Sequence, residues 1–291
     1  MHPAPSVIVF TTLSGAGFGF LAFLSLGLVG ATGMQAFLIW ALGYALAVGG
    51  LCASTFHLGN RQRAWRAFTQ WRTSWLSREG WAAVLALLAT APLALQAIFG
   101  LAVPVVLGPI AAALCLMTVV ATAMIYTQLA TVPRWNHALT PVTFMAFALT
   151  GGAVLAGLGL WAAVLCVALS AILFLGFVEG DKRFAARGAS LASATGLGRA
   201  GRPRVFAPAH TAGNYLMREM MFSVGRKHRA RLRVLALVLA GLVPAAILVL
   251  APGGVVAAGV AFGTHLLGAL AARWLFFAEA EHVVGLYYGA R

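Results

Sequence analysis

Charged residues are scarce in this chain. Of its 291 residues only 9% are charged, and six of these are Asp or Glu, whereas an average soluble domain has roughly 25% charged residues. Hydrophobic residues make up 62% of the sequence, and the mean hydropathy is +0.92. Such a composition cannot cover a water-facing surface, so it predicts an all-α integral membrane protein. We attribute the net charge of +14 to basic residues in the segments that flank the membrane spans, and we expect no nucleic-acid partner.

Cysteine is scarce as well. Cys52, Cys115 and Cys166 all lie inside apolar runs and form no CxxC pair, which excludes a disulfide framework and an iron–sulfur cluster held by this chain. No Lys or Arg precedes Arg61, so the amino terminus lacks the basic region of a cleaved signal peptide. We therefore expect the first apolar run to be a retained membrane span.

Long apolar runs dominate the rest of the sequence. A spanning helix needs about 20 apolar residues, so the chain predicts eight transmembrane helices in a single membrane domain, residues 1–291. The fifth and sixth helices come from one long run that we divide near Gly157 and Gly159. The expected spans are about 7–30, 36–57, 79–99, 105–130, two within 142–178, 234–250 and 255–277.

The charges predict an orientation. With eight spans both termini share one side of the membrane, and all twenty Lys and Arg and all six acidic residues fall on that side or at its border. The positive-inside rule makes that side cytoplasmic, including the two longer polar segments, 58–78 and 179–233. The other side has only short neutral turns, so we expect any protein partner on the cytoplasmic face.

The two polar segments carry different patterns. In 58–78, arginines alternate with Trp65, Phe68, Trp71 and Trp75 at helical spacing, which predicts a helix lying in the membrane interface. In 179–233, GLGRAG matches a dinucleotide fingerprint, but no strand precedes it and we reject the match. A later apolar face predicts an interfacial or partner-docking helix; its residues are Leu216, Met217, Met220, Met221 and Val224.

His57 and Glu79 flank the basic loop at the ends of neighbouring apolar runs. Ionisable groups at the edge of a bilayer are candidates for function. A quinone site needs donors to the quinone oxygens, a group that exchanges protons, and apolar walls. His57 can donate and titrates near neutrality, Glu79 can relay a proton, and Arg63 lies nearby. The alternative is structural: Glu79 complements a helix dipole behind an N-cap at Ser77, and Arg63 anchors headgroups.

Other sites and functions are weighed against this one. Tyr126 and Arg134 form a second candidate quinone site. An ion or solute transporter, the alternative of another class, is expected to have polar or broken helices near the midplane, where His265 is the clearest polar group here. A haem b anchor needs two axial histidines inside the bundle. Since His57 and His265 are expected at different depths, we predict no haem and no metal in this chain.

Two segments resemble a known family. FHLGNRQRAWRAF at 56–68, followed by SWLSREG, resembles the HLG…RAF…LSxE pattern of dimethyl sulfoxide reductase anchor subunits. IYTQLATVPRWNHALTPVTF at 125–144 resembles that family's TVPxW…TP segment. The segment from 194 to 233 is similar to the branch that anchors cytoplasmic sulfite:quinone oxidoreductases, whereas GNRQ at 59–62 is more basic than the usual loop.

The resemblance implies a haem-free anchor in the bacterial cytoplasmic (inner) membrane that binds ubiquinone or menaquinone. An iron–sulfur subunit and a molybdopterin catalytic subunit would dock on its cytoplasmic face and hold the clusters and the molybdenum cofactor. In the family, the histidine of HLG and the glutamate opening the next helix serve the quinone; here they are His57 and Glu79. The predicted function is electron transfer from sulfite oxidation to quinone. The alternative is a dimethyl sulfoxide or polysulfide-type reductase that draws electrons from quinol.

Overall fold

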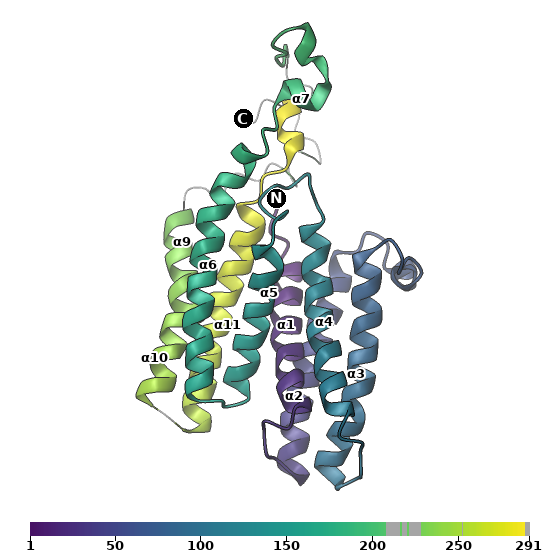
Figure 1. Cartoon of the computed structure of the whole chain (residues 1–291), viewed down its shortest axis with the longest axis vertical. Helices are drawn as coiled ribbons and strands as arrows, with labels where there is room; N and C mark the ends of the chain where they lie inside the picture. Colours follow the sequence, from purple (N-terminus) through teal and green to yellow (C-terminus); the bar gives the residue numbers. More distant parts are fainter. Residues whose placement is uncertain (208–215, 217–219, 221–227, 252, 289–291) are drawn as a thin grey trace.

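The computed structural model describes residues 1–207, 216, 220, 228–251 and 253–288, and these residues form helices and connecting turns without a strand (Figure 1). The long helices are α1 (Pro5–Ser25), α2 (Gly33–Ser54), α3 (Trp75–Phe99), α4 (Leu107–Thr127), α5 (Leu139–Leu155), α6 (Leu160–Ala186) and α11 (Val255–Ala278). Between α6 and α11 in the sequence, three helical segments follow one another without a break: α9 (Arg229–Leu237), η5 (Val238–Leu242) and α10 (Val243–Leu250).

The helices have the length and composition of membrane spans. Inside hydrocarbon every backbone N–H and C=O must be paired within the protein, which an α-helix achieves along its own length. Seven helical segments of the described chain are long and apolar enough to cross a membrane. The remaining apolar helix, α5, has 17 residues and is shorter than these seven. The predicted all-α membrane class is thus confirmed, and the chain is a multi-pass membrane protein.

The long apolar run breaks where the sequence predicted. Gly157 and Gly159 have φ angles of 67° and 52°, in the left-handed region that glycine enters without steric cost. These residues form the turn between α5 and α6. The division of 142–178 into two helices is therefore confirmed.

Helix α1 lies at the centre of the bundle and packs against α2, α4, α5 and α11 (Figure 1). Small residues permit this close approach. A Cβ added at Gly19 would overlap the Ala148 carbonyl of α5, and one added at Gly152 of α5 would overlap the Gly19 backbone. The first four helices form one half of the bundle, and α5, α6, α9–α10 and α11 form the other.

Pro244 interrupts the backbone hydrogen bonding of the segment α9–η5–α10, next to the π-turn η5. Pro244 has no N–H, so it cannot donate to the carbonyl of Ala240 four residues earlier. The ring nitrogen Nδ1 of His265 on α11 lies 2.7 Å from that carbonyl oxygen, and the Ser170 hydroxyl on α6 donates to the Leu237 carbonyl at 2.9 Å. Both carbonyls are therefore paired by neighbouring helices. The His265 contact therefore links α11 to the segment α9–η5–α10.

The basic loop differs from its prediction. Residues 55–57 and 61–68 form the 3₁₀ helices η1 (Thr55–His57) and η2 (Arg61–Phe68), followed by turns. The predicted helix therefore includes Trp65 and Phe68 but does not continue through Trp71. The expected N-cap at Ser77 is also wrong: α3 begins at Trp75 after Ser74, and the Ser77 hydroxyl accepts from the Gln70 N–H at 3.2 Å. The apolar face predicted within 216–224 lies outside the described residues, apart from positions 216 and 220.

Candidate functional site

Glu79 is a carboxylate enclosed between two helices. It lies in the second turn of α3 and is only 4% exposed. The Thr122 hydroxyl of α4 donates to Glu79 Oε1 at 2.5 Å, and it also lies 3.0 Å from the Thr118 carbonyl. A buried carboxylate is costly unless it is hydrogen-bonded or protonated. Glu79 meets this condition through the Thr122 hydroxyl.

The basic loop packs over the same turns of α3. The Trp81 indole N–H donates to the Phe68 carbonyl at 3.0 Å, and the two rings meet edge to face at 5.6 Å. The Phe68 ring also lies 3.0 Å from where a Cβ on Gly80 would stand. The end of η2 is thus fixed beside Glu79, which keeps the arginines of the loop at this end of the bundle.

His57 and Arg63 lie on the surface of that end. His57 ends η1, directly after α2, and Arg63 is in η2; both are exposed. In the described part of the chain neither side chain has a hydrogen-bond partner, so no hydrogen bond links them to Glu79. The three predicted residues therefore share one end of the bundle, with Glu79 inside and the other two at the surface.

Tyr126 packs in an aromatic core. It is buried on α4, one turn after Thr122. Its ring lies within 5.7 Å, centroid to centroid, of four other rings: Trp135, Phe144, Phe276 and Phe277. These rings join the connection after α4 to the end of α11. This packing gives Tyr126 a structural role in the α4–α11 contact.

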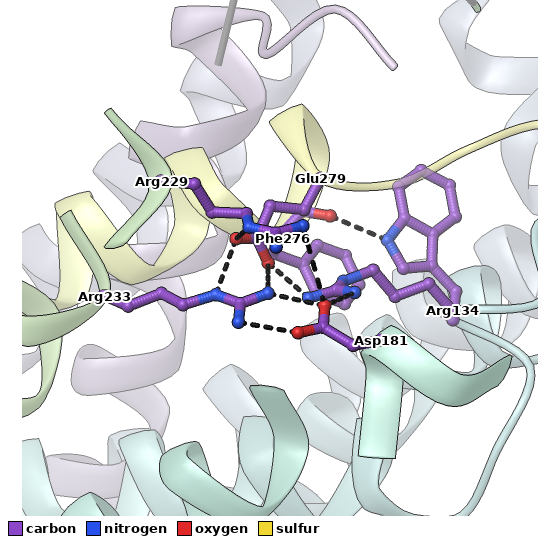
Figure 2. Close-up of polar contacts among 7 residues, drawn as sticks. Arg134, Asp181, Arg229, Arg233, Phe276 and Glu279 are labelled. Carbon is purple, nitrogen blue, oxygen red and sulfur yellow. Dashed lines mark hydrogen bonds and ion pairs between the residues drawn. The ribbon is translucent and has the colours of Figure 1, made fainter. Parts of the chain in front are cut away.

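Arg134 belongs to a cluster of ion pairs (Figure 2). It contacts Asp181 at 2.9 Å and also pairs with Glu279. Arg233 contacts Asp181 at 2.6 Å and Glu279 at 2.7 Å, and Arg229 lies 3.9 Å from each carboxylate. We call these five residues the arginine–carboxylate cluster. It joins α6, α9, α11 and the connection between α4 and α5.

Two interior residues escaped the sequence analysis. Thr122 of α4 was not a candidate, yet its hydroxyl donates to Glu79. Arg273 of α11 is 2% exposed, and its guanidinium carbon lies 3.6 Å from the centre of the Phe144 ring. Its Nε atom has no hydrogen-bond partner among the described residues. The signal was an arginine inside an apolar run, which is itself a functional indication.

Comparison with known proteins identifies the family. The sequence profile of the DMSO reductase anchor subunit (DmsC) matches residues 1–278. The chain belongs to the DMSO reductase anchor subunit family. This anchor subunit is 33% identical to a sulfite dehydrogenase subunit of Allochromatium vinosum, over 99% of both chains. No solved structure matches it. The predicted resemblance is confirmed, and membership implies catalytic and iron–sulfur partner subunits.

The arginine–carboxylate cluster predicts a large stability effect. The Glu279 side chain is 4% exposed, and Glu279→Ala would leave Arg134 and Arg233 partly unpaired. Removing one partner of a buried ion pair costs about 3 kcal/mol or more. We expect a clear fall in the melting temperature of the detergent-solubilised protein.

The matched control is Glu179→Ala. Glu179 pairs with Arg183 at 2.8 Å, but both side chains are 37% exposed, and an exposed pair contributes at most about 1 kcal/mol. Equal melting temperatures for the two variants would show that the cluster is dispensable.

Proposed function

We propose that this anchor subunit binds quinone near the loop at 55–79 and passes electrons between an iron–sulfur subunit and the quinone pool. The observation that carries the proposal is Glu79, a carboxylate enclosed between α3 and α4 directly beneath that loop. Family membership supplies the redox partners and favours this function over a transporter.

The residues suit proton exchange with a quinone. Reduction of a quinone to a quinol takes up two electrons and two protons. The exposed His57 can exchange protons with water, and Glu79, held by the Thr122 hydroxyl, can exchange one in the interior. The Arg63 guanidinium adds positive charge beside them, where it attracts a developing negative charge or an anionic headgroup. The proposal includes no haem in this chain, because a haem b anchor needs two axial histidines inside the bundle, and His265 is buried whereas His57 is exposed at the end of the bundle.

The proposed topology has eight spans with the charged end in the cytoplasm. A 17-residue helix is about 25 Å long, slightly short of the roughly 30 Å hydrocarbon core. Helix α5 is covered by α1, α4, α6 and α11, so its ends face protein on several sides. The amino terminus and the end of α11 meet, since the Met1 amine donates to the Ala280 carbonyl at 2.6 Å.

Reporter fusions test this topology. We expect fusions after Arg63 and Leu197 to report cytoplasm and a fusion after Gly253 to report the opposite side, because an odd number of crossings separates them. A cytoplasmic signal after Gly253 would contradict eight spans.

The proposed electron donor is sulfite. Support comes from the similarity to the sulfite dehydrogenase subunit of Allochromatium vinosum and from the proposed cytoplasmic orientation of the charged face. One sulfite and one water give sulfate, two protons and two electrons, which matches the demand of one quinone. The alternative direction, from quinol to a sulfoxide or polysulfide, uses the same anchor.

Activity of the isolated complex decides between the two directions. With its catalytic and iron–sulfur partners present, we expect sulfite to drive reduction of a soluble quinone analogue, measured by the quinone absorbance. Inertness toward sulfite together with quinol-driven sulfoxide reduction would establish the reverse direction.

Substitutions at the loop test the quinone site. His57→Ala and Glu79→Gln should leave the complex assembled and slow quinone turnover at least tenfold, about 1.4 kcal/mol in activation free energy. The measurement is steady-state quinone reduction, with dye-linked sulfite oxidation as the check on the partner subunits.

Glu179→Gln is the control, because it also neutralises a carboxylate at this end but changes only an exposed pair. Normal quinone kinetics in both loop variants would place the site elsewhere in the anchor.

A further inference from the structure

A cavity lies between α5, α6 and α11, which stand in the other half of the bundle from the loop at 55–79 (Figure 1). Its volume is about 60 Å³, several times the space that one water molecule occupies, and the cavity is open on one side. Phe147, Leu173, Phe177 and Phe276 form apolar walls. None of the residues that line it belongs to α2, α3 or the loop between them.

Arg273 lines this cavity with donors that the described protein leaves unused. The side chain is 2% exposed, and its guanidinium lies over Phe144 at 3.6 Å and Phe147 at 4.9 Å. Its Nε atom has no hydrogen-bond partner in the part of the chain that the structure describes. Burying a cation without acceptors is expensive. A ligand oxygen in the cavity would offset that cost.

His137 supplies a second donor. Its Nδ1 atom accepts from the Leu139 backbone N–H at 3.3 Å, so in the neutral ring the proton is on Nε2. Burial lowers the pKa of His137, which keeps the ring neutral at neutral pH. The hydroxyls of Thr140 and Thr143 donate to the Trp135 and Leu139 carbonyls. His137 and Arg273 therefore bring N–H groups to the lining of the cavity.

Three charged residues line the cavity: Arg134, Arg273 and Glu279. Glu279 is paired with Arg134 and Arg233, whereas the Arg273 guanidinium lies over Phe144 and Phe147. The Arg273 N–H groups can donate to a carbonyl oxygen of a ligand. Aromatic walls and two donors suit a planar ring with two carbonyl groups.

We propose that this cavity binds a second quinone molecule, whose carbonyl oxygens accept from Arg273 and His137. The inference rests on the proposed function in one respect, that the complex uses quinone. It assigns a site separate from the loop at 55–79, on different helices.

Photoaffinity labelling tests the assignment on the complete complex. An azidoquinone is cross-linked to the purified complex, and the labelled peptides are identified by mass spectrometry. We expect label in α5, α6 or α11 of the wild type, and the same label in His57→Ala and Glu79→Gln. His137→Phe should reduce it roughly threefold to tenfold through the loss of one hydrogen bond.

A cavity-filling pair of variants gives the sharpest comparison. Gly176 lines the cavity, and a Cβ there would have Thr143 Oγ1 as its nearest neighbour at 3.9 Å. Gly176→Ala therefore fits and should leave labelling unchanged. Gly176→Phe places a ring in the cavity and should reduce labelling of α5, α6 and α11 at least tenfold, without changing label near the loop. This variant leaves Arg273 and its contacts with Phe144 and Phe147 intact.

Each other outcome overturns the inference. Label confined to residues 55–79 would refute the second site and retain the proposed function. Unchanged label in Gly176→Phe would place the bound quinone outside the cavity. Absence of label from the whole anchor, with the azidoquinone still reduced by the complex, would refute both the cavity and the quinone site at the loop.

Discussion

The arginine–carboxylate cluster fixes one end of this bundle. Asp181 and Glu279 are the carboxylates of two different helices, and they hold arginines from α9 and from the connection after α4. Near a membrane the low dielectric makes an unpaired charge expensive, so the segments must meet for the charges to be buried at all. The Met1 amine donates to Ala280 beside Glu279, which brings the chain's first residue to the same place.

From this end the bundle divides into two halves, α1–α4 and α5–α11, which meet where α1 packs against α5. Glycines on α1 and α5 let the two backbones approach closely. Each half contains a buried ionisable side chain near this end of the bundle: Glu79 between α3 and α4, and Arg273 on α11. The Tyr126 aromatic core lies between the halves, since it joins α4 to the end of α11.

The Glu79 and Arg273 side chains differ in what they can do for a bound quinone. A carboxylate can take up or release a proton, whereas a guanidinium donates hydrogen bonds and stays charged. Glu79 therefore suits the site where protons accompany electrons, and Arg273 suits a site where a ring is held through its carbonyl oxygens. The two proposed sites use different helices, so a substitution at one is expected to leave the other unchanged.

Much of this protein was predictable from local features of its sequence. The scarcity of charge determined the membrane class, and hydropathy located the long helices to within about five residues at their ends, with the break at Gly157 and Gly159. The loop from His57 to Glu79 gave the first candidate site and, together with 125–144 and 194–233, the resemblance to the family. These features are properties of neighbouring residues, and the physics of lipid acts on them directly.

Only the tertiary structure decided which side chains meet. Arg134 and Glu279 are 145 residues apart, and no local pattern pairs them. Most of the spanning helices are apolar on every face, so periodicity does not indicate which face turns inward. The rotation of each helix about its own axis placed Glu79 against Thr122, directed Tyr126 into an aromatic core, and left Arg273 buried beside a cavity. Each outcome follows from helix packing across the bundle, which a single sequence does not specify.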